Sequence, residues 1–254
     1  MDLRLSKPLI NTCFTLESDL EIVHGDFPAS LTAPVKLSAV LQDIFEFLTA
    51  HPTESIVLSM KHEGPFSYEA TDLANILLSS SCPTYFETLH RDQWFLEPRI
   101  PTLGEIRGKI VLFRRFSCDS EDIPRLGIPA SWTYNTTGET SVSLLEVPML
   151  AVQDYSELQS RADIPLKIEY IIQHVNRAAA DVNENTLYLN FTTGSNLWYL
   201  ACWPRRVAKH TRTPVADVFP GASGKCGIVI LDFPELDRWN LVKLIIERNS
   251  QFQS

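Results

Sequence analysis

The stretch VKLSAVLQDIFEFLTAHPTESIVLSM, residues 35–60, decides the fold class. Apolar residues recur through its first part at helical spacing, so we predict a helix over residues 35–50. His51-Pro52 ends this helix, because the residue before a proline avoids the α conformation. The run Ile56-Val-Leu-Ser-Met60 follows without regular polar alternation, which is typical of a strand covered on both faces. The stretch therefore predicts a helix followed by a buried strand, the unit from which α/β folds are built.

The same alternation continues in both directions along the chain. Further helices are predicted at residues 164–182 and 235–249. The predicted strands are residues 3–5, 20–24, 55–60, 109–113, 148–153, 186–191 and 227–232. Alternation without a Gly/Ser-rich linker or an internal repeat favours one α/β barrel over an open sheet with a second domain. The strands number about seven, where about eight are usual, so we predict a distorted, incomplete TIM-type (β/α) barrel.

Composition narrows the class of protein further. The chain has 254 residues, with 22 Lys+Arg against 31 Asp+Glu, and a formal net charge of −9. An acidic chain of this kind does not have the broad basic face that nucleic-acid binding requires, so no nucleic-acid partner is expected. It also contains no apolar run of about 20 residues, the length of a membrane-spanning helix. The five cysteines are scattered and form neither a disulfide framework nor a zinc-binding pattern.

Charged and polar residues follow or end most of the predicted strands. In an α/β barrel the active site lies at the carboxyl ends of the strands. The residues at or near these ends are Arg4, His24, Lys61, Glu63, Arg114, Arg115, Asp154, Tyr155 and Asp232. Cations, carboxylates and one histidine around a single mouth predict a site for a phosphorylated polyol.

Several of these segments, taken together and in order, resemble a known family. Residues 51–63 and residues 101–116 (PTLGEIRGKIVLFRRF) are similar to strand signatures of the X domain of phosphatidylinositol-specific phospholipase C. Val152-Gln-Asp-Tyr, Leu189-Asn-Phe-Thr and Ile230-Leu-Asp-Phe are similar to its later strand ends. The resemblance extends from about Asp2 to Asn249 and points to the bacterial-type branch, the PLC-like phosphodiesterases found in bacteria and fungi.

The resemblance implies a reaction and a set of catalytic residues. The family cleaves phosphatidylinositol by attack of the inositol 2-hydroxyl on phosphorus, which releases diacylglycerol and a cyclic inositol phosphate. His24 matches the histidine that protonates the leaving oxygen, a role suited to a pKa near neutrality. Arg4 matches an arginine that stands where the animal enzymes hold calcium, and Asp2 matches a carboxylate that positions it. The resemblance therefore implies a calcium-independent enzyme with no metal and no cofactor.

The resemblance also implies an inositol-binding set, which consists of Lys61, Glu63, Arg115, Asp154 and Tyr155. The family places one residue between the aspartate and the tyrosine, whereas here the two are adjacent. Asp232 matches the carboxylate that orients the base histidine.

The base histidine itself has no match, because the family carries it on a Gly-Thr-His-like strand before the Asp-x-Arg segment. His51, His62, His90, His174 and His210 fall elsewhere in the pattern. One strand and the base histidine are both missing, so we expect residues 1–254 to be a single X domain that is incomplete at its amino terminus. Loss of such a base commonly costs about 10²–10⁴ in rate.

A phospholipase must also contact lipid. The membrane contact predicted here consists of Trp198, Tyr199, Trp203, Arg205 and Arg206, since aromatic residues favour the headgroup region and basic residues attract anionic lipid. Residues 131–134 (SWTY) are a second candidate. The alternative is an amphipathic helix that packs its aromatic residues inward.

Three functions remain open from the sequence. The first is cleavage of phosphatidylinositol or a related phosphodiester lipid at a membrane surface. The second is a catalytically inactive protein that binds inositol phosphate or lipid through Lys61, Arg115 and Asp154. The third, a glycosidase with Glu63 and Asp154 as its two carboxylates, leaves the arginines and lysine without a role.

Overall fold

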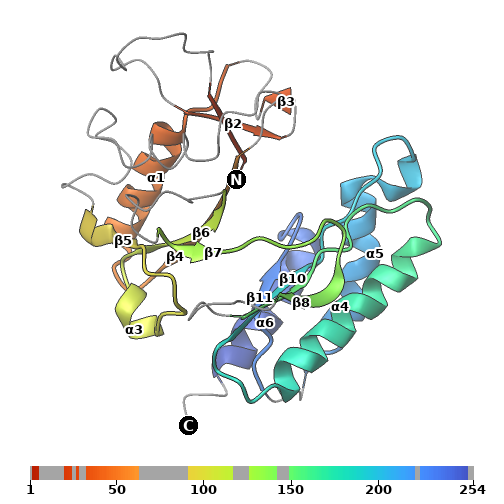
Figure 1. The fold of residues 1–254 in the computed structure, drawn as a ribbon. Helices are drawn as coiled ribbons and strands as arrows, with labels where there is room; N and C mark the ends of the chain where they lie inside the picture. The colour runs from red at the N-terminus through yellow and green to blue at the C-terminus, as the bar shows by residue number, and fades with distance from the viewer. Residues whose placement is uncertain are drawn as a thin grey trace. The chain divides into compact units, whose positions relative to one another are not determined.

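The computed structural model describes residues 2–5, 20–24, 27–28, 33–62, 91–116, 126–141, 149–220 and 224–250. The chain divides into two compact units, residues 1–131 and 132–254. Each unit has its own hydrogen-bonded sheet (Figure 1), and no closed ring of strands forms among the described residues.

The first unit is a mixed sheet with a helix on one face. Its strands are β1 (Asp2–Leu5), β2 (Leu20–His24), β3 (Phe27–Pro28), β4 (Ile56–His62), β5 (Trp94–Phe95), β6 (Ile110–Arg115) and β7 (Ile128–Pro129). They lie in the order β3-β2-β1-β4-β6-β5, and β7 also pairs with β6. Strands β1, β4 and β6 are mutually parallel, as predicted. Strand β2 instead runs antiparallel to β1, unlike the all-parallel strands of a regular (β/α) barrel.

Helix α1 (Leu37–Ala50) covers this sheet. Its residues Leu37, Leu41, Phe45 and Leu48 recur at helical spacing and are all buried. They form one core with the even-numbered residues of β4 and β6, which are Leu58, Met60, Ile110 and Leu112. The helix ends where the sequence predicts, since the His51 amide donates to the Phe47 carbonyl immediately before the proline.

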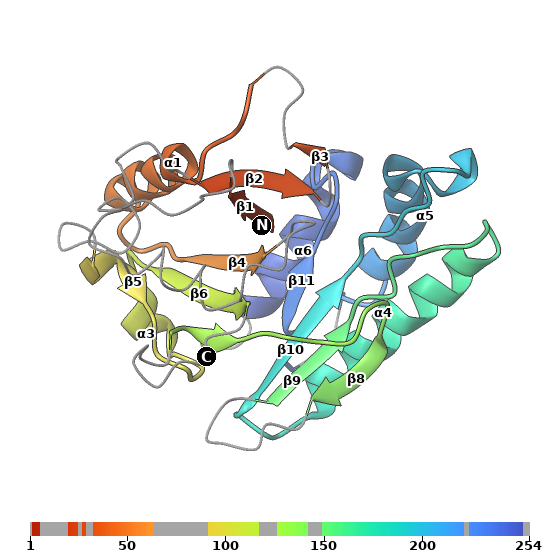
Figure 2. The same cartoon turned by 45° about the horizontal axis from the view of Figure 1, so that its top comes forward.

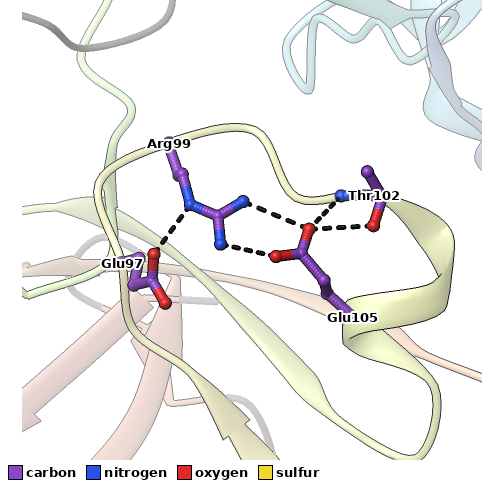
Figure 3. Close-up of polar contacts among 4 residues, drawn as sticks. All are labelled: Glu97, Arg99, Thr102 and Glu105. Atoms are coloured by element: carbon purple, nitrogen blue, oxygen red, sulfur yellow. Dashed lines mark hydrogen bonds and ion pairs between the residues drawn. The ribbon is translucent and has the colours of Figure 1, made fainter.

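A short helix, α3 (Leu103–Ile106), leads into β6 and is held by an exposed polar cluster (Figure 3). The Glu105 carboxylate accepts hydrogen bonds from the amide and the hydroxyl of Thr102, both at 2.8 Å. Arg99 donates to Glu105 at 2.6 and 3.1 Å and to Glu97 at 2.7 Å. The Arg99 guanidinium, with help from Thr102, lowers the pKa of Glu105 to about 2. A 3-10 turn, η1 (Arg91–Gln93), precedes β5.

The second unit is a four-stranded sheet covered by helices, in the order β11-β10-β9-β8 (Figure 2). The strands are β8 (Thr137–Ser141), β9 (Met149–Gln153), β10 (Thr186–Phe191) and β11 (Ile228–Ile230). Strands β9, β10 and β11 are parallel, and β8, which the sequence did not predict, is antiparallel to β9. The helices are α4 (Asp163–Ala180), η2 (Leu200–Cys202), α5 (Pro204–Ala216), η3 (Leu236–Trp239) and α6 (Asn240–Ser250).

Two predicted boundaries in this unit differ from the structure. Strand β11 covers only part of the predicted residues 227–232. Gly227 lies outside it, with a φ of +70°, and a Cβ added there would lie 2.5 Å from the Cβ of Tyr188. The predicted helix 235–249 is interrupted, since Asp237 and Arg238, within η3, adopt left-handed backbone angles before α6 begins. The apolar face of α6 is as expected, with Leu241 buried against α4 and α5. None of the described helices combines the length and the apolar character that crossing a bilayer requires.

Candidate active site

In the first unit, the strand ends predicted to carry the site lie side by side. The backbone register places Val23, Asp2, Lys61 and Arg115 in one row across β2, β1, β4 and β6. His24 is the residue after Val23 and ends β2. The sheet therefore places the backbone of Asp2, His24, Lys61 and Arg115 close together, with Asp2 at the start of β1 and the other three at or near the carboxyl ends of their strands.

Lys61 and Arg115 are direct neighbours on two parallel strands, so their side chains leave the same face of the sheet. That face is opposite α1, because Met60 and the even-numbered positions of β6 pack against the helix. Both side chains are half-buried. Two cations side by side at strand ends form a position suited to a phosphate or a ring hydroxyl.

Arg114, the other cation at the end of β6, has a structural role. Its guanidinium donates to the Leu126 carbonyl at 2.9 Å and to the Phe116 carbonyl at 2.7 Å. These bonds secure the segment that leads into β7. Of the two arginines, Arg115 is therefore the one on the candidate-site face.

The other predicted residues of this unit are only partly described. For Asp2, Arg4 and His24 the structure describes the backbone, in which Arg4 pairs with Glu21. Glu63 lies outside the described residues.

In the second unit, Asp154 follows β9 and is held by a tryptophan. The indole Nε1 of Trp132 donates to Oδ2 of Asp154 at 3.0 Å, and its ring packs on Phe191 with centroids 5.6 Å apart. Residues 131–134 were considered as a lipid contact, but Trp132 is committed to Asp154, whereas the neighbouring Tyr134 is exposed. A single tryptophan in a polar loop gave no signal of this role.

The segment that begins at Asp154 is fixed along its backbone. The Asp154 amide donates to the Thr136 carbonyl, and the Tyr155 amide donates to Oε1 of Gln153 at 2.9 Å. The next two amides, of residues 156 and 157, donate to Oδ1 of Asn135, at 2.8 and 2.9 Å. Asn135 has a positive φ of 56°, a conformation that asparagine tolerates better than most residues. Four successive amides are therefore hydrogen-bonded, and the Asp154 side chain projects from a rigid corner.

The structure argues against Tyr155 as a ring-stacking residue. Its ring meets Tyr170 of α4 edge-on, with centroids 5.3 Å apart, and packs on the core of Leu158 and Val207. Burial, followed by the charge of Asp163, raises the pKa of its hydroxyl. The adjacent residues Asp154 and Tyr155 thus have different partners: Asp154 accepts a hydrogen bond from Trp132, whereas Tyr155 packs on Tyr170.

Asp232 lies two residues beyond β11, and its backbone is clamped by Arg212 of α5. The buried guanidinium donates to the carbonyls of Asp232 at 2.9 Å and Phe233 at 2.7 Å, and to those of Pro234 and Leu236 at 3.1 and 3.2 Å. Burial raises the pKa of the Asp232 carboxyl, and the charge of Lys167 opposes this shift. Neither Arg212 nor Lys167 was among the residues predicted from the sequence.

The aromatic segment before α5 is exposed, so the alternative in which its rings pack inward is wrong. The exposed fraction is 99% for Trp198, 46% for Tyr199 and 48% for Trp203. Arg206 is also exposed. Arg205 is exposed but already paired, with Glu235 at 3.4 Å and over the Phe233 ring at 5.4 Å.

Comparison with known proteins gives a consistent result. No family model matches the chain. It is 29% identical over 241 residues to a 1-phosphatidylinositol phosphodiesterase of Listeria monocytogenes, covering 92% of this chain and 65% of the relative. It is 24% identical over 220 residues to that of Staphylococcus aureus strain Newman, covering 78% of this chain and 62% of the relative. The chain thus spans less than two thirds of the length of these relatives.

Solved structures show the same likeness. A phosphatidylinositol-specific phospholipase C from S. aureus, with pentafluoro-Phe incorporated, superposes with a TM-score of 0.72 and 19% identity, over 96% of this chain and 78% of that one. The enzyme from L. monocytogenes gives a TM-score of 0.61 and 25% identity, over 90% and 74% of the two chains. The fold is therefore that of a PLC-like phosphodiesterase, and the predicted fold class, an incomplete α/β barrel, is confirmed. The resemblance to the bacterial phosphatidylinositol-specific phospholipases C, drawn first from short motifs, is confirmed as well.

Proposed function

We propose that the protein is a phosphodiesterase of the phosphatidylinositol-specific phospholipase C type. It would cleave phosphatidylinositol into diacylglycerol and a cyclic inositol phosphate, without calcium. The proposal rests chiefly on similarity along 92% of the chain to an enzyme named 1-phosphatidylinositol phosphodiesterase. The neighbouring cations Lys61 and Arg115 at two strand ends support it, because such a pair suits an anionic phosphorylated ligand.

The proposed catalytic roles follow the chemistry of phosphodiester cleavage. His24 donates the proton to the leaving diacylglycerol oxygen, and Arg4 neutralises the phosphoryl charge, positioned by Asp2. Asp232 matches the carboxylate that orients the base histidine in the family. No histidine of this sequence matches that base, so the assay must distinguish turnover from binding alone.

Both units contain residues that the resemblance assigns to ligand binding. In the first unit, Lys61, Glu63 and Arg115 bind ring hydroxyls or phosphate. In the second unit, the Asp154 carboxylate accepts hydrogen bonds from ring hydroxyls, and Tyr155 is left out because its ring packs against α4.

The direct test is release of diacylglycerol from vesicles containing phosphatidylinositol, with EDTA and with added calcium. We expect equal release in both, and a loss of about 10²–10³ in rate for Arg115→Met, as for removal of one charge-stabilising group. Arg107→Met, an exposed position in the turn after α3, is the matched control. Binding of inositol 1-phosphate without any release would identify an inactive binding protein instead, and dependence on calcium would contradict the role of Arg4.

We further propose that residues 197–203 contact the lipid surface. Trp198 supports this, because a fully exposed tryptophan in water is costly to leave uncovered, and indole rings favour the headgroup region. Trp198→Ser should reduce sedimentation with phosphatidylinositol vesicles, whereas Trp239→Ser, at a half-exposed ring elsewhere in the same unit, should not. Equal sedimentation of the two variants would refute this assignment.

A further inference from the structure

Three polar side chains lie completely inside the second unit, between α4 and the sheet. Lys167 of α4, Gln153 of β9 and Asn190 of β10 all have an exposed fraction of 0%. Buried polar groups of this kind are costly unless hydrogen bonds replace the lost water. Each of the three is hydrogen-bonded within the unit (Figure 2 shows α4, β9 and β10).

In this chain of hydrogen bonds each side chain donates to the next, from Lys167 to Gln153 and from Gln153 to Asn190. The Lys167 amine donates to Oε1 of Gln153 at 3.0 Å, which fixes the orientation of the Gln153 amide because Nζ in its charged form can only donate. The Gln153 Nε2 must then face the other way, where it donates to Oδ1 of Asn190 at 2.8 Å. Asn190 in turn donates through Nδ2 to the Ile171 carbonyl of α4 at 3.0 Å. Lys167 is therefore one of the groups that fix the orientation of the Gln153 amide, and through it that of Asn190.

The same side chains hold the backbone just beyond two strands. Oε1 of Gln153 accepts the Tyr155 amide at 2.9 Å, in addition to the Lys167 amine. Nε2 of Gln153 donates to the Phe191 carbonyl at 3.0 Å. The corner that presents Asp154 is thus tied to the interior through Gln153, and Lys167 supplies the side-chain donor that holds Oε1 of Gln153 in place.

The charges around Lys167 fit this arrangement. Burial lowers the pKa of its amine to about 7, and the carboxylates of Asp154 and Asp232 oppose that shift. These two acids follow β9 and β11, and both belong to the candidate site. The charge of Lys167 in turn opposes the rise in the pKa of Asp232 that burial causes.

We propose that Lys167 is a positioning residue of the candidate site: through Gln153 it fixes the backbone at Tyr155, and so the direction in which Asp154 presents its carboxylate. Lys167 does not itself contact the ligand. The ligand in this inference, an inositol ring, rests on the proposed function, whereas the effect on the backbone does not.

The first test is amide hydrogen exchange at Tyr155, measured by NMR. In Lys167→Met this exchange should accelerate about tenfold or more, as for loss of one hydrogen bond to a charged group. Val175→Ala removes buried apolar volume from the same helix without touching the three polar side chains, and it controls for a general loss of stability. Acceleration that is equal in the two variants, or absent from both, would overturn the inference.

A second pair of variants separates orientation from packing. Gln153→Glu keeps an oxygen that accepts the Lys167 and Tyr155 donors but sets a second oxygen against the acceptors of Asn190 and Phe191, so exchange at Tyr155 should rise less than in the leucine variant. Gln153→Leu keeps the volume but removes that oxygen, so exchange should rise as it does in Lys167→Met. If both variants exchange alike, Gln153 does not transmit the effect of Lys167.

The third measurement is the affinity for myo-inositol, by NMR titration. We expect Lys167→Met to weaken it about tenfold and Val175→Ala to leave it unchanged. Faster exchange at Tyr155 with an unaltered affinity would overturn the role in ligand positioning. If the parent protein binds no inositol while the exchange pattern is as expected, the proposed function fails and the positioning of the Asp154 corner stands.

Discussion

We predict that the unfolding free energy of the second unit falls as the pH is lowered, because of the buried His174. Its side chain has an exposed fraction of 2%, on the face of α4 toward the sheet, with Nε2 3.1 Å from the Ala151 carbonyl. A carbonyl can only accept, so Nε2 carries a proton and donates to it. Burial, which disfavours the imidazolium, lowers the pKa of His174 from 6.5 to about 4.

The sign and size of the effect follow from this shift. Between pH 6.5 and 4 the unfolded chain holds a proton that the folded chain does not, so stability falls as the pH falls. At about pH 4.5, protonation stabilises the unfolded state by about 2.7 kcal/mol and the folded state by about 0.2 kcal/mol. His174 alone should therefore cost about 2.5 kcal/mol of unfolding free energy between about pH 7.5 and 4.5.

The assay is urea unfolding followed by tryptophan fluorescence at a series of pH values, for the parent protein and for His174→Gln. Glutamine keeps an N–H donor near Ala151 but does not titrate, so the difference between the two proteins isolates His174 from the carboxylates. We expect that difference to shrink by about 2.5 kcal/mol on acidification, in favour of the variant. A constant difference from pH 7.5 to 4.5 would show that the buried imidazole takes up a proton in the folded state, and would refute the reasoning.

Three further predictions concern the residues that surround the candidate site. Because burial lowers the pKa of Lys167 from 10.5 to about 7, stability should rise with pH across this interval, by about 3–5 kcal/mol, and urea unfolding of Lys167→Met should lack the rise. Arg212→Met removes the donors to four backbone carbonyls and should lower the unfolding free energy by about 3 kcal/mol, with faster amide exchange in residues 232–238 than elsewhere. Arg206→Gln should weaken binding to anionic vesicles more than Arg205→Gln, most clearly at low salt, because Arg205 is already paired with Glu235; the reverse order would contradict the lipid-contact assignment.

Much of the fold could be predicted from the sequence, because buried strands and amphipathic helices have distinct patterns. The apolar runs at 55–60 and 109–113 became β4 and β6, and helix α1 ended at its proline. The antiparallel direction of β2 could not be predicted, since a strand has the same composition in either direction. Strand β8 was missed because its sequence, TGETS, lacks the apolar residues that mark a strand.

The candidate site was predictable where residues end a strand, and not where they act through others. Lys61 and Arg115 met in register because charged residues at the ends of neighbouring parallel strands meet at one edge. Lys167 and His174 were passed over because they are polar. Yet both lie on the buried face of α4 with Ile164, Ile171 and Ala178, at helical spacing. A polar residue at an apolar position of the helical pattern was therefore the sequence signal that could have identified them. The packing of the Tyr155 ring against Tyr170 and an apolar core was not evident from its place after a predicted strand.

The one-way arrangement of Lys167, Gln153 and Asn190 limits how these positions can change in evolution. Replacing any one of them with an apolar residue removes a hydrogen-bond partner from at least one buried polar neighbour. Such a change is tolerated best when the others change with it. Among relatives of this chain, the three positions should accordingly be inherited as a set, either kept together or exchanged together for apolar residues.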